Sequence, residues 1–297
     1  MDRLFKSRRA LGRTGFIASQ LGIGDLADRS LGLRQCADTL RRAMDAGLNV
    51  IDTAPAYEDG FSEQVVGAAL AGRREGMFVI TKIDHLDQPV VPQVEGSLER
   101  LGLDSVDLLL FHGVSRVQDW QRLAAPGSGL DQLAQIIRQG KCRFAGLSSH
   151  HPDVLRLAIE SGRCDALMFA LGPFSDARYS EEILPQARAA GVATLGFKVF
   201  GAGMLLGDTS GYGRPLAADR SGGLPRLSVP QCLHYTLTLD PDVALLGMST
   251  PAEQDAAFEA AKTFAPLSAD QMAEIRAQAA AAVAGKGTCW WNPEKQL

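Results

Sequence analysis

The run Leu48-Asn49-Val50-Ile51-Asp52, followed by Thr53-Ala54-Pro55-Ala56-Tyr57, carries the pattern that decides the fold of this chain. A short, mainly apolar segment ends in a carboxylate, and the loop that leaves it carries a phenol. The pattern recurs twice downstream: Phe78–Lys82 ends in an ammonium group, and Val106–His112 ends in an imidazole. Near-continuous apolar runs are typical of parallel strands covered on both faces. The sequence therefore predicts neighbouring parallel strands that each end in a titratable group.

Eight runs of this kind alternate with helical patterns from one end of the chain to the other. Between them, apolar residues recur at three- and four-residue spacing, as on helices that pack one face against a sheet. The predicted strands are Ala18–Ile23, Leu48–Asp52, Phe78–Lys82, Val106–His112, Arg143–Leu147, Ala166–Leu171, Val192–Lys198 and Val243–Gly247. Such a chain forms either a closed barrel or a large doubly wound sheet.

The closed barrel is the better interpretation of the two. A doubly wound dinucleotide fold carries G-x-G-x-x-G directly after an early strand, whereas Gly22-Ile23-Gly24 lacks the third glycine and no helix start follows it. The chain has 297 residues and no linker-like break, and a barrel typically needs roughly 250. We predict one α/β domain over residues 1–297, a (β/α)8 TIM barrel with a long loop at 201–227 and a tail at 285–297.

The composition excludes several classes of protein. Hydrophobic residues make up 46% and charged residues 22% of the chain, and the formal net charge is −4. No run of Lys and Arg exceeds two residues, which argues against a nucleic-acid partner. The basic N-terminus has no apolar core that would make it a signal peptide, and no apolar stretch is long enough to span a membrane. The five cysteines are widely spaced and show no C-x-x-C pair, which indicates free thiols, no metal site and a cytoplasmic location.

Four side chains are the candidates for catalysis. Active sites of α/β barrels form at the carboxyl ends of the strands, where Asp52, Lys82 and His112 are expected, with Tyr57 on the adjoining loop. Each could instead be structural, as a strand-end ion pair and a buried histidine. Together they suit the reduction of a carbonyl group, which needs a proton donor for the developing alkoxide. Tyr57 would donate that proton, while His112 would orient the carbonyl oxygen.

Lys82 and Asp52 have supporting roles in this hypothesis. A phenol with a pKa of about 10 exchanges its proton poorly near neutral pH, and an adjacent ammonium group would lower the pKa of Tyr57. Asp52 would keep Lys82 charged and in position. A lysine at a barrel strand end also suits a Schiff-base lyase that uses Lys82. A third alternative is a regulatory barrel that binds a cofactor with little turnover.

The chain resembles the aldo-keto reductase family along nearly its whole length. The residues that carry the resemblance are Leu11–Gly15, Asn49–Tyr57, Ser62-Glu63, Val66-Gly67, Val79–Lys82, Leu101–Leu108, His112 and Gly140–Ser148. The closest similarity is to a branch with a Ser-x-His-x-Pro-like run, here Ser148 to Pro152. Many members of that branch carry a cysteine-rich iron–sulfur tail. This chain has only Cys289 there, so we expect no cluster.

The resemblance implies the (β/α)8 fold, a small carbonyl substrate and a cofactor, NADPH or alternatively NADH, bound without a Rossmann motif. It implies the catalytic group Asp52, Tyr57, Lys82 and His112, and a substrate pocket of Tyr57 and His112, to which we add Trp120 from the loop after His112. The cofactor-binding residues expected are Gly24, Asp52, Ser148, Ser149, Phe197, Lys198, Val199, Phe200, Gly201, Gly203, Gly247, Met248, Ser249, Thr250 and Gln254.

The sequence departs from the family pattern at three of the cofactor contacts. The family holds the nicotinamide carboxamide with a serine, an asparagine and a glutamine, and this chain has Ser149 and Met168 in place of the last two. Glu253 occupies about the place of an arginine that clamps the 2′-phosphate of NADPH. A carboxylate there could accept from a ribose hydroxyl instead. His150 follows the two serines, with a site role and a structural role equally open.

Overall fold

The structure is a computed structural model that describes residues 4–5, 8–212, 214, 216 and 224–293. Eight parallel strands close into a barrel, with each strand beside the next in the chain and the last beside the first. The barrel strands are β3 (Leu21–Ile23), β4 (Val50–Asp52), β5 (Phe78–Ile83), β6 (Val106–Phe111), β7 (Cys142–Ser148), β8 (Ala166–Ala170), β9 (Ala193–Phe197) and β10 (Val243–Leu246). The predicted (β/α)8 TIM barrel is confirmed.

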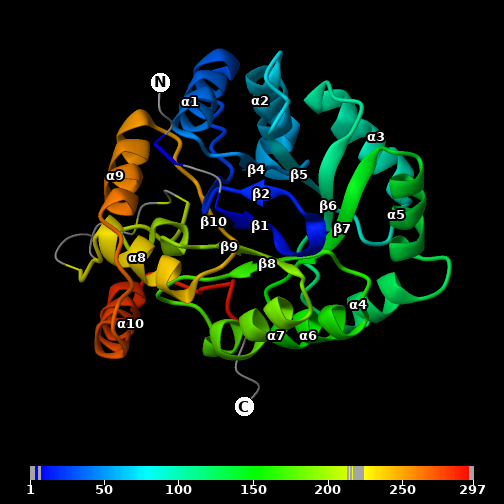
Figure 1. The fold of residues 1–297 in the computed structure, drawn as a ribbon. Coiled ribbons are helices and arrows are strands. Elements are labelled where there is room, and N and C mark those ends of the chain that lie inside the picture. The colour runs from blue at the N-terminus through cyan, green and yellow to red at the C-terminus, as the bar shows by residue number, and fades with distance from the viewer. Residues whose placement is uncertain (1–3, 6–7, 213, 215, 217–223, 294–297) are drawn as a thin grey trace.

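A ring of helices surrounds the strands (Figure 1). The helices are α1 (Leu33–Ala46), α2 (Phe61–Leu70), α3 (Val90–Leu101), α4 (Val117–Ala124), α5 (Gly129–Arg138), α6 (Pro152–Glu160), α7 (Leu184–Ala189), α8 (Val229–Leu239), α9 (Pro251–Lys262) and α10 (Ala269–Val283). The sequence encodes their ends locally. Thr250 and Glu253 form a reciprocal capping box at the start of α9, and Gly102 ends α3 in the left-handed conformation that glycine adopts at little cost.

The first predicted strand, Ala18–Ile23, was wrong as a single element. β2 (Ile17–Ala18) pairs antiparallel with β1 (Arg9–Ala10), and only β3 joins the barrel. The break falls at Ser19, whose backbone N–H donates to the Asn49 side chain at 2.7 Å instead of to a neighbouring strand. The β1–β2 hairpin therefore lies across the end of the barrel where the strands begin (Figure 1).

An apolar core fills the interior of the barrel from that end. Leu11 of the hairpin turn is fully buried against inward-facing side chains of the strands. The buried interior residues are Leu11, Ala18, Val50, Phe78, Ile80, Leu108, Leu110, Ala166, Met168, Ala193, Leu195, Val243 and Leu245. A second, larger apolar layer lies between the strands and the helices. The interior is thus a packed core, and polar chemistry is left to the ends of the strands.

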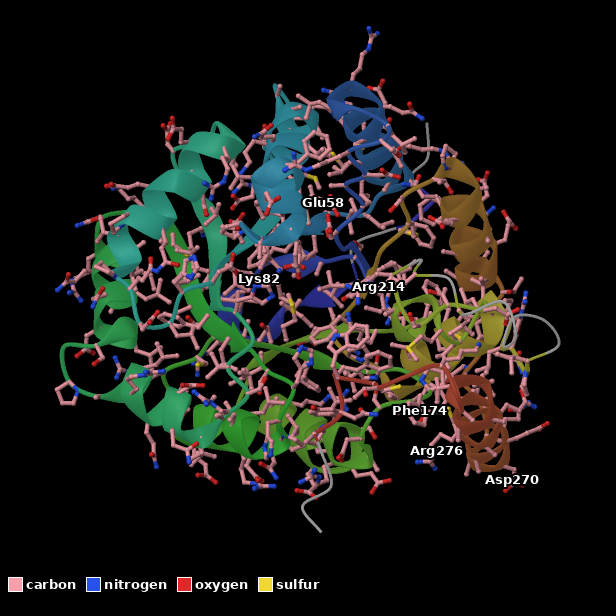
Figure 2. The ribbon with its side chains drawn as sticks, turned by 180° about the vertical axis from the view of Figure 1, so that it is seen from behind. Glu58, Lys82, Phe174, Arg214, Asp270 and Arg276 are labelled. Carbon is pink, nitrogen blue, oxygen red and sulfur yellow. The ribbon has the colours of Figure 1, made fainter. Side chains whose placement is uncertain are left out.

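Figure 2 looks onto the opposite end of the barrel, where the strands end and where Lys82 lies within the ring. Asp52 is the last residue of β4, Ser148 is the last residue of β7, and His112 directly follows β6. No helix in the described part of the chain is both long and apolar enough to cross a membrane. The five cysteines carry free thiols, and four of them are buried.

Close packing of α2 on α3 gives a test of this architecture. Gly67 of α2 lies against the end of α3, where an added Cβ would come within 2.8 Å of the carbonyl carbon of Leu101. Gly96 of α3 also lies mid-helix, but a Cβ there would meet only the flexible tip of Arg100 at 3.2 Å. We expect Gly67→Ala to lower the free energy of unfolding by about 1–3 kcal/mol through overpacking. Gly96→Ala should raise it by about 0.5–1 kcal/mol through helix propensity.

Urea unfolding of both variants, followed by circular dichroism, measures the two changes. Equal midpoints for Gly67→Ala and Gly96→Ala would contradict the close approach of the two helices.

Candidate active site

Lys82 and Asp52 form a buried ion pair at the centre of the strand ends. Their exposed fractions are 1% and 4%. Lys82 Nζ donates to Asp52 Oδ1 at 2.6 Å and to the carbonyl oxygen of Thr53 at 2.8 Å. Burial raises the pKa of Asp52, and the charge and hydrogen bond of Lys82 oppose that rise. A buried ammonium group needs such a partner, because its desolvation is otherwise uncompensated.

Tyr57 lies against this ion pair. Lys82 Nζ is 4.5 Å from the centroid of the phenol ring, a cation–π contact. The two residues after Tyr57, Glu58 and Asp59, have φ values of 49° and 50°, which non-glycine residues rarely adopt. Arg29 Nε donates to the carbonyl oxygen of Glu58 at 3.0 Å and helps to hold this turn. The loop therefore fixes the phenol over the ammonium group by backbone geometry as well as by packing.

His112 faces Tyr57 and is paired with a carboxylate that sequence reasoning missed. Its ring lies edge-on to Tyr57 with centroids 5.6 Å apart, and its Nδ1 hydrogen-bonds Asp84. Asp84 also accepts from the backbone N–H of Ala56, next to Tyr57. Burial alone would raise the pKa of Asp84, but the His112 hydrogen bond lowers it below its usual value. With the proton on Nδ1 held by Asp84, Nε2 is the nitrogen free to meet a substrate.

The expected lowering of the Tyr57 pKa is wrong. Burial and the charge of Asp52 raise the pKa of Tyr57 well above its ordinary value, and Asp25 and Asp84 add to the rise. Lys82 donates its hydrogen bonds to Asp52 and to the carbonyl oxygen of Thr53. The sequence indicated that Tyr57 lies near Lys82 and Asp52, but not that two further carboxylates act on Tyr57. Tyr57 therefore holds its proton at neutral pH.

Asp25 is a second carboxylate that the sequence analysis did not single out. It follows β3, accepts from the backbone N–H of Ala27 at 3.1 Å, and accepts from the hydroxyl of Ser62. Burial raises the pKa of Asp25, while these bonds and the charge of Lys82 lower it. A carboxylate two residues after the end of the first barrel strand was the signal that could have found it.

The end of β7 presents two serines of different character. Ser148 Oγ accepts from the backbone N–H of Gly113 at 2.8 Å and keeps its own proton for another partner. Ser149 is fully buried, and its hydroxyl is used within its own turn by the N–H and the carbonyl of His151 at 3.0 and 3.2 Å. The expectation that Ser149 contacts the cofactor is therefore not supported, because no polar atom of its side chain is free.

The loop after β9 combines a cation with aromatic rings. Lys198 has a φ of 64°, and its Nζ lies 5.4 Å from the Phe197 ring, 4.5 Å from the Tyr212 ring and 5.7 Å from the Trp290 ring. Burial and the charge of Lys82 lower the pKa of Lys198 to about 8. Further along, Gly201 and Gly203 have positive φ values of 56° and 90°.

Val199 between these residues is buried, and Phe200 packs on the core. Both side chains therefore belong to the apolar packing, and the cofactor contacts expected of Val199 and Phe200 stay predictions. Residues 213, 215 and 217–223 of the predicted long loop, and 294–297 of the tail, lie outside the described residues.

The cofactor contacts expected near the end of β10 include one, Gln254, that the structure does not support. Gly24 lies so close to this strand that a Cβ would come within 3.3 Å of the Leu246 carbonyl oxygen. Met248 is buried, and Thr250 caps α9. The cofactor contacts expected of Gly247 and Ser249 stay predictions. Gln254 is fully buried, donates to Thr39 O at 2.8 Å and accepts from Arg42 at 2.9 Å. It joins α9 to α1, so the cofactor contact expected for Gln254 is not supported.

The tryptophans also have defined places. Trp120 was expected in a loop, but it lies on α4 and is buried in the outer apolar core at 5% exposure. This placement corresponds to packing, and its role in the substrate pocket stays a prediction. Trp291 is fully buried and anchors the tail, with its ring N–H donating to Phe174 O at 2.8 Å. Figure 2 shows Phe174 beside this C-terminal segment.

Among the described residues, no cluster of three or more His, Cys, Asp or Glu side chains could hold a metal ion. The arrangement offers instead a protonated phenol, a buried ammonium group and an oriented imidazole around one space. These groups can donate a proton to an oxygen and stabilise the charge that develops on it.

Two curated proteins with related sequences are methylglyoxal reductases by name. The chain is 37% identical over 113 residues to methylglyoxal reductase YeaE of Escherichia coli, which covers 37% of each protein. It is 28% identical over 226 residues to the NADH-specific methylglyoxal reductase of the same organism, which covers 66% of this chain and 68% of that one. The first of these alignments thus spans little more than a third of the relative's length.

Solved structures share the fold over nearly the whole chain. An aldo-keto reductase from Bacillus halodurans in its holo form superimposes with a TM-score of 0.70 at 24% identity, covering 91% of this chain and 95% of that one. An aldo-keto reductase from Klebsiella pneumoniae in complex with NADPH gives a TM-score of 0.69 at 19% identity, covering 96% of each. A sequence profile described as "Aldo/keto reductase family" matches residues 20–222, more than half of the sequence. The chain belongs to the aldo/keto reductase family.

Proposed function

We propose that this protein reduces an aldehyde or ketone to an alcohol by hydride transfer from NADPH, with NADH as a possible alternative, and that Tyr57 donates the proton. One observation carries the proposal: Lys82 Nζ lies 2.6 Å from Asp52 and 4.5 Å from the centroid of the Tyr57 ring, and the His112 ring lies 5.6 Å from the same ring. Family membership supports the same activity.

The residues around the strand ends fit a nicotinamide cofactor. Among the described residues, a buried ring nitrogen of His150 has no hydrogen-bond partner and the Ser148 hydroxyl, which accepts from Gly113, donates to none; Phe197 adds an aromatic ring beside His150. Lys198, with Gly201 and Gly203, combines a cation with backbone that can approach a diphosphate closely. These residues would hold the cofactor, and the nicotinamide supplies the hydride when it is bound.

The catalytic side chains act on the carbonyl oxygen in this proposal. Tyr57 holds a proton at neutral pH and hands it from its hydroxyl to the oxygen as negative charge develops there. His112, oriented by Asp84 through Nδ1, directs Nε2 to the same oxygen. Lys82 stabilises the phenolate that remains, and Asp52 keeps the ammonium group in place. Donors fixed before the reaction stabilise this charge without reorganising.

The small carbonyl substrate is supported by the names of two relatives. The two Escherichia coli relatives compared above are methylglyoxal reductases by name, so a 2-oxoaldehyde is the first substrate to test. The free thiols support a reducing, cytoplasmic location. The Schiff-base alternative has less support, because Lys82 is 1% exposed and already holds two hydrogen bonds.

Replacing the proton donor tests the proposal directly. Tyr57→Phe should lower kcat for the reduction of methylglyoxal by at least about 100-fold, because general acid catalysis contributes on that order. Binding of NADPH, measured by fluorescence titration, should persist and so show that the variant is folded. Wild-type turnover by Tyr57→Phe would refute the assignment. Borohydride trapping of substrate on Lys82 without any cofactor would favour the lyase.

The raised pKa of Tyr57 sets the expected pH dependence. Reduction uses protonated Tyr57, so kcat/KM for reduction should stay nearly level between about pH 6 and 9. Oxidation of the alcohol uses the ionised phenol, so its rate should rise with pH by up to about tenfold per unit. Steady-state rates in both directions measure this. A reduction rate that falls with a midpoint near pH 7 would indicate another proton donor.

Asp84 acts as a positioning residue in this mechanism. Asp84→Asn leaves an amide that can donate to Nδ1 and select the wrong tautomer of His112. We expect kcat to fall at least about tenfold, with the affinity for NADPH unchanged and with an altered pH profile. Asp87→Asn, on the same loop but exposed, is the matched control. Equal pH profiles for wild type and Asp84→Asn would contradict this role.

A further inference from the structure

The ring of His150 contains a buried nitrogen that has no partner. His150 lies in the turn after β7, and its Nδ1 makes no hydrogen bond within the described residues although it is shielded from solvent. Buried polar atoms are nearly always paired, and one left unpaired is costly. Such an atom at the mouth of a barrel therefore indicates a contact completed by a ligand.

The surroundings of His150 fix the ring inside the site. Its backbone N–H donates to Ser115 Oγ at 3.1 Å, which holds the turn. The ring lies edge-on to Phe197, with centroids 5.4 Å apart and planes at 86°. The charged or titratable groups that act on it are Lys198 and His112, both of which can carry positive charge. The His150 ring thus contacts Phe197 at the end of β9 and lies within electrostatic range of Lys198 and His112.

This environment keeps the ring uncharged. Burial, followed by the charges of Lys198 and His112, lowers the pKa of His150 to about 4. A neutral imidazole has one N–H donor and one acceptor nitrogen. It therefore suits a neutral polar group, and it does not repel an oxidised nicotinamide ring, which is positively charged.

The neighbouring residues do not supply equivalent polar atoms. The Ser149 hydroxyl is satisfied by the backbone of His151, and Met168, beside Ser148 in the paired strands, is apolar and buried. Only Ser148 keeps a free donor among these three. A primary carboxamide presents both N–H donors and a carbonyl acceptor, so a single serine leaves it incompletely paired.

We propose that His150 Nδ1 hydrogen-bonds the carboxamide of the nicotinamide ring, in place of the contacts that Ser149 and Met168 do not make. This inference rests on the proposed function, because it assigns a residue to the cofactor of that reaction. His150 is then a cofactor-positioning residue. Its neutral ring accepts from the carboxamide nitrogen, and Ser148 donates to the carboxamide oxygen.

Equilibrium binding to the full-length protein tests the inference without turnover. The probes are NADP⁺, its 3-acetylpyridine analogue, which lacks the amide N–H, and 2′-phospho-ADP-ribose, which lacks the ring. His150→Phe keeps a ring of similar size but loses the nitrogen. We expect this substitution to weaken NADP⁺ binding about three- to tenfold, as the loss of one hydrogen bond would. Binding of the acetylpyridine analogue should be weakened less, and 2′-phospho-ADP-ribose should bind to the variant as tightly as to wild type.

His150→Asn provides the matched rescue. Its side-chain oxygen can accept the same hydrogen bond, so NADP⁺ affinity should return most of the way to the wild-type value. Unchanged NADP⁺ affinity in His150→Phe, or equal weakening of all three probes, would overturn the inference. So would an unchanged NADP⁺ affinity with a raised KM for the carbonyl, which would place His150 against the substrate. If wild type bound no nicotinamide nucleotide at all, the proposed function itself would fail.

Discussion

The buried charge of Lys82 is the constraint on which the rest of the site depends. An ammonium group at 1% exposure inside a barrel is stable only if a carboxylate and further acceptors lie within reach. Asp52 and the Thr53 carbonyl of the adjacent strand provide them at 2.6 and 2.8 Å. Removing one partner of such a pair typically costs about 3–5 kcal/mol. The pairing of β4 with β5 is therefore fixed by charge as well as by apolar packing.

The position of Tyr57 follows from that pair. Two N–H groups of Lys82 are directed at Asp52 and Thr53, and the remaining side of the ammonium group faces the phenol ring at 4.5 Å. Burial raises the pKa of Tyr57, and the charge of Asp52, which stabilises Lys82, adds to that rise. The same electrostatic field thus fixes a cation and protects a proton. A site that must deliver a proton to a carbonyl oxygen requires this combination.

The sequence predicts well which side chains meet at the carboxyl ends of the strands, because this depends only on the place of each residue at the end of its strand. Asp52, Lys82 and His112 follow apolar runs, and the parallel barrel brings them together. Asp84 was missed because it lies two residues beyond Lys82, and its partner His112 is known only from the register of β5 and β6. The strand break at Ser19 was missed for a similar reason, since a side chain of a neighbouring strand, Asn49, causes it.

Two cofactor contacts expected from the family motifs are not supported, because the side chains already form hydrogen bonds within the protein. Ser149 and Gln254 occupy plausible positions, yet both are fully buried with their polar atoms paired inside the protein. Glu253, which stands about where the family has a phosphate-clamping arginine, accepts from the backbone N–H of Thr250 at 3.1 Å in the α9 capping box.

A carboxylate held at a helix N-terminus is partly compensated by the helix dipole. It would repel a 2′-phosphate less than an isolated carboxylate would. The burial that commits Ser149 and Gln254 to the scaffold therefore also identifies His150, whose unpaired nitrogen the scaffold leaves available to a ligand.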